Sequence, residues 1–167
     1  MELWQQGGIH LVINRESQSF AQRYHTEHGL SVCAYGLSCP YVLGLFERAT
    51  KLCYQIEYAD QEHDTHGVAA ITGPTGALFY LVDSNAPSPH WEREFVYYVV
   101  DPNSYLSRVD HVATTLPLDQ VLEATLLYRA LFQMQASPSV SLPDPLGLVK
   151  SQVIDSSGRL FAGNDTE

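Results

Sequence analysis

The sequence predicts an α+β fold that contains two similar repeats, each running from a strand through a helix to further strands. The apolar residues of 41–52 recur at the helical spacing and leave the charged residues outside. Residues 67–83 have the β-prone stretches and the central turn of a β-hairpin. The order seen in 31–83 returns in 109–161 with different residues, so the repeat is one of pattern.

Ahead of the first repeat, residues 7–13 predict a strand because apolar side chains alternate along them. A turn follows, in which Ser17 or Ser19 is suited to cap a short helix. We expect that helix to end at Gly29, since glycine commonly follows the last helical turn.

The first repeat begins with a short apolar strand over 31–37, and a further strand is predicted within 53–59. Residues 60–64 are polar and predict a loop. After the hairpin, 84–94 predict a connection, and the β-prone residues 95–100 predict an edge strand.

The second repeat is predicted to start with a strand over 109–116, followed by a helix over 118–133. One face of this helix is centred on Leu118, Val121, Leu122, Thr125 and Phe132. Leu127 and Leu131 lie on the opposite side, which indicates a second buried surface. Further strands are predicted at 137–142, 146–154 and 159–161.

We therefore divide the chain into four parts: 1–30, a reduced opening with a strand and a helix; 31–83, the first repeat; 84–107, a connection; and 108–167, the second repeat. A small sheet under one helix leaves its other face uncovered. That concave face is where a ligand is expected.

Charge and cysteine content limit the function classes. The 9 basic and 19 acidic residues give a net charge of -10 without a basic cluster, which argues against nucleic-acid binding. The 3 cysteines form no CxxC pair, which favours a reducing cytoplasm over a disulfide framework. The start has no signal-peptide pattern. The charge-free stretch 29–46 is interrupted by Pro40 and predicts a strand and a helix, not a membrane span.

Histidines are the candidate chemical groups. They are His10, His25, His28, His63, His66, His90 and His111. We interpret His25 and His28 as an exposed pair at a helix end, and the segment 63–66 as a polar loop. His10 faces either a cavity or solvent. His111 differs because it opens a predicted strand, which would direct its imidazole into the concave face.

Three segments carry a resemblance to a known family. They are Val109–Val112, the helix containing Tyr128–Phe132, and Leu142–Ser151. Together they resemble 4-hydroxyphenylpyruvate dioxygenase, and Gln6–Asn14, Ser31–Ala34 and Phe79–Asp83 extend the likeness over nearly the whole chain. The sequence is most similar to the dioxygenase-like C-terminal domain of some bacterial 3-dehydroshikimate dehydratases.

The resemblance implies a fold of βαβββ modules of the vicinal-oxygen-chelate superfamily, forming curved mixed sheets as half-barrels. It implies that His111 is a ligand of Fe(II), that Ser151 lies near the substrate, and that Asn164 corresponds to a substrate-site asparagine. The parent activity is the oxidative decarboxylation of an aromatic 2-oxo acid. The sequence at 162–164 is Ala-Gly-Asn, where the family has Pro-x-Asn.

The resemblance also implies that the iron site of this chain is incomplete. The family's second metal-binding histidine and its metal-binding glutamate belong to a further module that has no counterpart here. Three functions follow as hypotheses: a dioxygenase-like protein with a partial site, a non-catalytic accessory or oligomerisation module of a dehydratase–dioxygenase-like fusion, or a metal-dependent lyase or isomerase. We expect a homodimer, or pairing with further modules, because the sheets leave apolar faces to bury.

Overall fold

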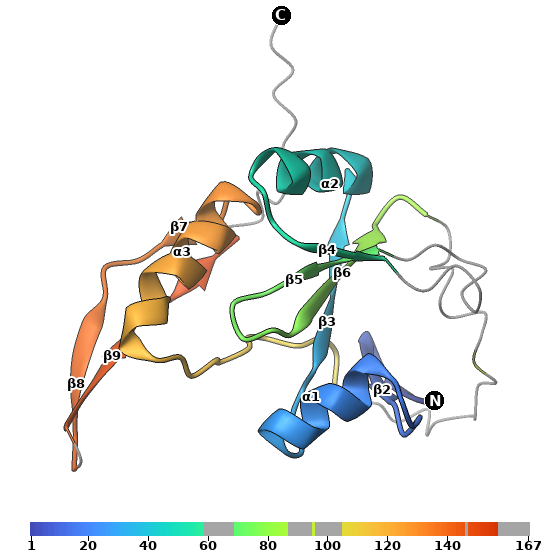
Figure 1. Ribbon diagram of the computed structural model, residues 1–167, viewed down its shortest axis with the longest axis horizontal. Coiled ribbons are helices and arrows are strands. Elements are labelled where there is room, and N and C mark those ends of the chain that lie inside the picture. The colour runs from blue at the N-terminus through green and yellow to red at the C-terminus, as the bar shows by residue number, and fades with distance from the viewer. Residues whose placement is uncertain (59–68, 87–94, 96–104, 146, 157–167) are drawn as a thin grey trace, which may run out of the picture. The chain divides into compact units, whose positions relative to one another are not determined.

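The computed structural model describes residues 1–58, 69–86, 95, 105–145 and 147–156 (Figure 1). Contacts divide the chain into two compact units. Unit 1 contains Met1–Cys33 and Ala86–Thr115, and unit 2 contains Ala34–Asn85 and Leu116–Glu167. The predicted division at residues 30, 83 and 107 stays a prediction.

Unit 1 opens with a β-hairpin. β1 (Glu2–Gln6) pairs antiparallel with β2 (Ile9–Ile13), and Gln6 lies opposite Ile9. The two glycines between them form the tight turn, and Gly7 has a φ of 57°, which favours glycine. The predicted strand over 7–13 was therefore placed too early at its start, and β1 was missed.

Helix α1 (Phe20–His28) follows and is bounded by the residues that the sequence indicated. The Ser19 side chain caps it by accepting a hydrogen bond from the backbone N–H of Gln22 at 3.2 Å. Gly29 ends the helix at a φ of 71°, and its N–H donates to the carbonyl of His25. The predicted helix is confirmed, with Ser19 and not Ser17 as its cap.

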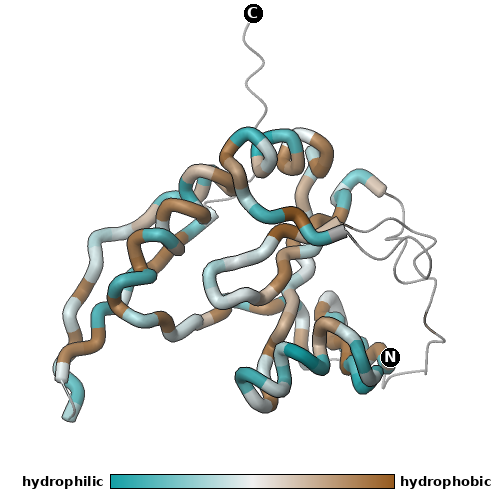
Figure 2. The backbone as a smooth tube through the Cα atoms, viewed as in Figure 1, coloured by the Kyte–Doolittle hydropathy of each residue, from teal (hydrophilic) through white to brown (hydrophobic). Residues whose placement is uncertain are grey.

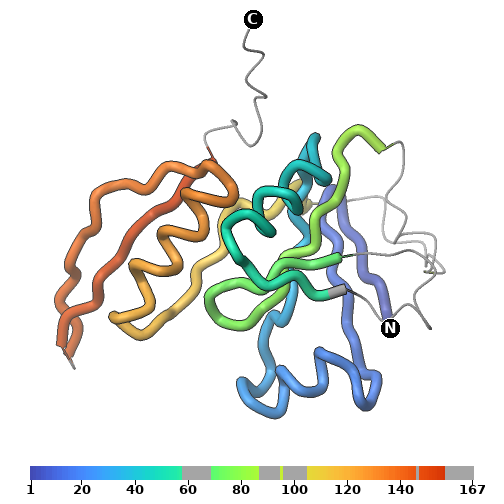
Figure 3. Tube along the Cα trace, turned by 45° about the horizontal axis from the view of Figure 1, so that its top comes forward, coloured from blue at the N-terminus to red at the C-terminus, as the bar shows by residue number. Residues whose placement is uncertain are grey.

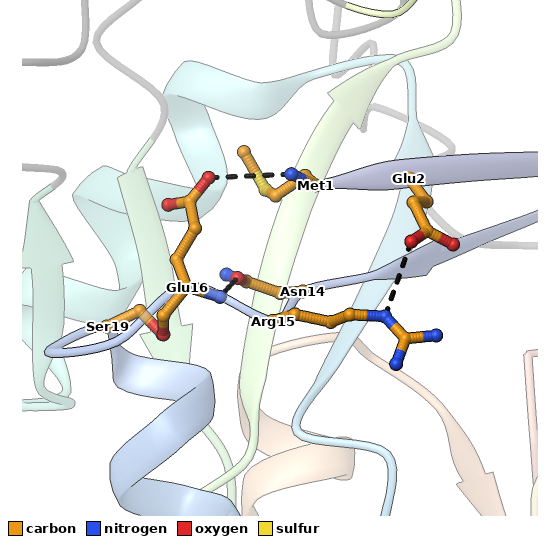
Figure 4. A network of polar contacts seen from close by, with 6 residues as sticks. All are labelled: Met1, Glu2, Asn14, Arg15, Glu16 and Ser19. Atoms are coloured by element: carbon orange, nitrogen blue, oxygen red, sulfur yellow. Dashed lines mark hydrogen bonds and ion pairs between the residues drawn. The ribbon is translucent and has the colours of Figure 1, made fainter.

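A polar network joins the hairpin to the loop that precedes α1 (Figure 4). The Met1 amino group lies 3.5 Å from Glu16, and Arg15 Nε lies 3.3 Å from Glu2 Oε1. The backbone N–H of Glu16 donates to Asn14 Oδ1 at 2.9 Å. Because these groups are exposed, their ion pairs contribute little to the free energy of unfolding.

Unit 2 contains a four-stranded mixed sheet in the order β3-β6-β5-β4. Its elements are β3 (Ala34–Cys39), α2 (Val42–Lys51), β4 (Ile56–Tyr58), β5 (Ala69–Thr72) and β6 (Leu78–Asp83). β3 runs parallel to β6, and the other two pairs are antiparallel. This βαβββ order confirms the first predicted repeat, including its helix and its hairpin.

The rest of unit 2 is a helix followed by short strands. A 3₁₀ turn (Leu118–Gln120) leads into α3 (Val121–Ala130). β7 (Gln135–Ala136) pairs with β10 (Ile154–Asp155), and β8 (Val140–Asp144) pairs with β9 (Gly147–Ser151), both antiparallel. In both views α3 runs alongside these strands (Figures 1 and 3).

The core of unit 2 lies between one face of the mixed sheet and the two helices. Its buried members are Cys39, Leu45, Ala49, Ile71, Phe79, Leu81, Leu127, Leu131 and Phe132. The ring of Phe79 meets that of Phe132 edge-on at 5.6 Å between centroids. Figure 2 shows apolar and polar residues interspersed along both α2 and α3.

The predicted buried face of α3 was wrong. Leu118 and Leu122 are 70% and 76% exposed, whereas Leu127 and Leu131, predicted as a second surface, are buried. Of the residues chosen for that face, Phe132 is the one that reaches the core. The helix is also shorter than predicted, and it ends before Phe132.

The strand predicted over 109–116 is not present. Residues 105–117 form neither helix nor strand, and nearly all of their side chains are exposed. The second repeat therefore lacks its opening strand. Of the edge strand predicted over 95–100, Phe95 lies in a bend, and residues 96–100 lie outside the described residues, as does the strand predicted over 159–161. The α+β class itself is confirmed. No helix in the described part of the chain combines the length and apolar character that crossing a membrane requires.

Candidate metal-ligand segment

His111 lies in the extended connection that ends unit 1, not at the start of a strand. Its side chain is 79% exposed. Its Nδ1 lies 2.9 Å from Oδ2 of Asp110, which is 82% exposed. The two side chains therefore form an adjacent acid–imidazole pair on the surface of unit 1.

Asp110 is placed to orient the His111 ring, as carboxylates beside metal-binding histidines do. In the tautomer that carries its proton on Nδ1, the Nδ1–H donates a hydrogen bond to Asp110. Nε2 then keeps its lone pair and is directed away from the carboxylate. Carboxylates that hold metal-ligating imidazoles act in this way. Because both side chains are exposed, the pair orients the ring without contributing much to stability.

A long-range contact fixes the backbone just ahead of His111. The N–H of Gly8, in the β1–β2 turn, donates to the carbonyl of Ser107 at 2.9 Å. A Cβ at Gly8 would lie 2.6 Å from that oxygen, so the chains approach this closely because residue 8 is glycine. Sequence reasoning missed this contact, although the Gly7-Gly8 dipeptide was a signal for a tight turn.

Ser151 and Asn164 were the predicted substrate-site residues. Ser151 ends β9, lies opposite Val140 in the ribbon, and is exposed. It belongs to unit 2, whereas His111 belongs to unit 1. Asn164 lies outside the described residues.

The remaining histidines are spread over several elements. His10 lies in β2 opposite Gln5 and is partly buried. His25 and His28 lie exposed in the last turn of α1, as predicted, and the centroid of the His28 ring lies 4.1 Å from that of the tilted Tyr24 ring. His63, His66 and His90 lie outside the described residues. Within the residues that the structure describes, no three His, Cys, Asp or Glu side chains gather as metal ligands do.

Two other ionisable groups in unit 2 belong to the core. Burial raises the pKa of the Cys39 thiol to about 11, and the charge of Asp83 acts in the same direction. Burial, followed by the influence of Tyr35, raises the pKa of the Tyr128 phenol. Both shifts keep the groups neutral near pH 7, so neither is an activated nucleophile or base.

The βαβββ order and mixed sheet of unit 2 define a glyoxalase-like module of the vicinal-oxygen-chelate type. The family described as "Hydroxyphenylpyruvate dioxygenase, HPPD, N-terminal" matches residues 1–101. Because that match covers more than half of the chain, the protein belongs to this family. His111, Ser151 and Asn164 all lie beyond the matched stretch.

Individual relatives agree with this assignment. The chain is 34% identical over 161 residues to 3-dehydroshikimate dehydratase of Pseudomonas putida, covering 93% of this chain and 25% of that protein. It is 27% identical over 135 residues to 4-hydroxyphenylpyruvate dioxygenase of Legionella pneumophila, covering 80% of this chain and 38% of that protein.

A solved structure shares the fold over most of the chain. It is described as a xylose isomerase-like TIM barrel/4-hydroxyphenylpyruvate dioxygenase fusion protein. The TM-score is 0.68 at 27% identity, covering 90% of this chain and 24% of the other. This chain therefore spans about a quarter of the length of the dehydratase and of the fusion protein.

Proposed function

We propose that this chain is a 4-hydroxyphenylpyruvate dioxygenase-like module that supplies His111 to an iron site and catalyses no oxidation by itself. The observation that carries the proposal is the exposed Asp110–His111 pair, which offers one oriented imidazole nitrogen. The relationship to named dioxygenases supports iron as the metal and an aromatic 2-oxo acid as the substrate class.

The described residues do not fit an Fe(II) centre on their own. Such a centre in a non-haem oxygenase needs two histidines and one carboxylate on one face of the metal. His111 provides one donor, and no group of three metal-binding side chains is found in the described ranges. We infer that the remaining ligands come from a further module or from another chain.

Ser151 is proposed as a substrate-binding residue of the same module. It lies on one face of the β8–β9 ribbon together with Val140, Leu142 and Val149, because residues opposite or two apart share a face. These apolar side chains are 49–56% exposed and would suit an aromatic ring, while the Ser151 hydroxyl would suit a carboxylate or carbonyl. Asn164 is proposed for the same role from the resemblance.

Pairing with a second copy or with further modules is also proposed. The β8–β9 ribbon has two strands, and every described side chain in it is exposed. Ribbons of two strands are marginal in water without a covering surface. Sedimentation velocity over a range of concentrations should show a dimer, and L142E should shift it to monomer. A monomer at every concentration would contradict pairing with a second copy, and pairing with further modules would then be the remaining proposal.

Oxygen uptake with 4-hydroxyphenylpyruvate and Fe(II) tests the lack of self-contained catalysis. We expect the chain to consume oxygen no faster than the same iron in protein-free buffer. The control is H111A, which should behave in the same way. Turnover above the iron background that H111A abolishes would show a complete site and contradict the proposal.

An accessory role in a dehydratase–dioxygenase-like fusion is the second candidate. The observation that favours it is the 34% identity to a 3-dehydroshikimate dehydratase over 93% of this chain. In that case His111 has no metal to bind, and H111A should leave every binding property of the module unchanged. Metal affinity that depends on His111 would instead favour the first proposal.

A further inference from the structure

One face of α2 forms the floor of an open hollow in unit 2, with a volume of about 470 Å³. Its lining is Tyr41, Gly44, Glu47, Arg48, Lys51, Leu52 and Ala130. Residues 44, 47, 48 and 51 follow the helical spacing and share one side of α2, while Leu45 and Ala49 face the core. The hollow is therefore separate from the segment that carries His111.

The Tyr41 ring lies directly over the first turn of α2. A Cβ at Gly44 would lie 1.7 Å from Tyr41 Cε1, so the ring occupies the space that any other side chain would fill. Tyr41 stands at the N-cap position but makes no capping hydrogen bond with its side chain, and it is 61% exposed. Tyr41 thus lines the hollow with an aromatic ring, which can lie there because residue 44 has no side chain.

Arg48 lies one helical turn beyond Gly44. Its guanidinium is contacted by Gln133, which follows the C-terminal end of α3. With the Gln133 amide turned so that its oxygen faces Arg48, that oxygen accepts hydrogen bonds from both terminal guanidinium nitrogens, one of them at 2.7 Å. Gln133 has a φ of 56°, an uncommon conformation for a residue other than glycine. The guanidinium is pre-positioned, and its further N–H groups stay available for an anion.

The charge of the hollow differs from that of the whole chain. Arg48 and Lys51 are 2 of the 9 basic residues in a chain of net charge -10, and Glu47 is the acidic residue of the lining. A helix C-terminus already favours cations, which accounts for the presence of basic residues there. It does not account for the Tyr41 ring in the same lining or for the Gln133 contact.

We propose that this hollow binds an aromatic carboxylate, with the ring stacked on Tyr41 and the carboxylate paired with Arg48. Lys51 adds a second positive charge at the carboxylate end. A guanidinium recognises a planar carboxylate through paired hydrogen bonds, and a tyrosine ring stacks favourably on another aromatic ring. The site is distinct from the proposed iron function and stands without it.

Benzoate titration of the whole chain tests the proposal, followed by NMR or by isothermal calorimetry. We expect saturable binding at one site, weakened at least about tenfold by R48Q, because a charge-assisted hydrogen bond is lost. The control is K150Q, which removes a positive charge from β9 outside the lining and should leave the affinity unchanged. Circular dichroism checks that each variant keeps its fold.

The aromatic part of the proposal has its own comparison. Cyclohexanecarboxylate has the same charge without the aromatic ring and should bind about 3- to 10-fold more weakly than benzoate. Y41A, at an exposed position, should abolish this preference without unfolding the chain. Absence of saturable benzoate binding, equal loss in R48Q and K150Q, or equal affinity for the two acids would overturn the proposal.

Discussion

Replacing Phe132 by alanine is the sharpest test of how α3 is joined to the sheet of unit 2. Phe132 is 1% exposed, and its ring meets Phe79 of β6 edge-on and Tyr128 at 6.3 Å. Withdrawing such a ring from the core loses about 1.5–3 kcal/mol of transfer free energy. The cavity left behind brings the expected loss of unfolding free energy to about 3–5 kcal/mol.

The assay is urea denaturation followed by circular dichroism, with L122A in α3, the helix that precedes Phe132, as the control. Leu122 is 76% exposed, so its loss should change the unfolding free energy by no more than about 0.5 kcal/mol. Hydrogen exchange gives a local readout, because F132A should also reduce the protection of the β6 amides. A loss below about 1 kcal/mol in F132A, or an equal loss in L122A, would refute the description of this core.

Two further predictions concern unit 1 and the cysteines. G8A should open the contact between the β1–β2 turn and Ser107, seen as faster hydrogen exchange at residue 8 and altered His111 imidazole NMR signals, whereas G29A should leave the His111 signals unchanged. Unaltered His111 signals in G8A would contradict the tether. In native protein at pH 8, a thiol reagent should modify the exposed Cys53 quickly and Cys39 slowly, because burial and a pKa raised to about 11 leave Cys39 protonated. Equal rates at the two thiols, measured by mass spectrometry, would show that Cys39 is not buried.

Local signals in the sequence were sufficient for α1, α2 and the β5–β6 hairpin. Ser19 and Gly29 satisfy the backbone groups at the two ends of α1, so its bounds are set by neighbouring residues. For α2 the apolar spacing selects the side that contains the buried Leu45 and Ala49, although Leu43 on another side is exposed. In these elements the local preference and the tertiary contacts agree.

The buried side of α3 could not be chosen from periodicity because leucines occur around the whole helix. Leu122 and Leu126 are exposed, while Leu127 and Leu131 are buried. The choice is made by the aromatic contacts of Phe132 and Tyr128 with Phe79, a residue far away in the sequence. Only the tertiary structure brings those rings together.

The two errors in unit 1 have a related cause. β1 has the residues Glu-Leu-Trp-Gln-Gln, whose polar members have low strand preference, and it forms because the Gly7-Gly8 turn pairs it with β2. The strand predicted over 109–116 does not form, and no strand pairs with these residues in the described ranges. Strand formation depends on pairing as much as on residue type.

The role of His111 as a metal ligand stays a prediction, and the sequence indicated the residue without its surroundings. His111 was identified from its surrounding motif, and the structure adds the Asp110 contact that orients its ring. The Gly8–Ser107 contact joins segments far apart in the sequence, so neither segment alone indicates it. The proposed aromatic-acid hollow likewise depends on Gln133, which approaches Arg48 from another element.

Anaerobic Fe(II) titration by calorimetry tests the central claim most directly, because that claim is the contribution of a single ligand by His111. We expect weak binding that does not saturate with one tight equivalent of iron, and we expect H111A to weaken it further while H25A does not. Tight, stoichiometric Fe(II) binding by this chain alone would contradict the claim, and so would weak binding that H111A leaves unchanged.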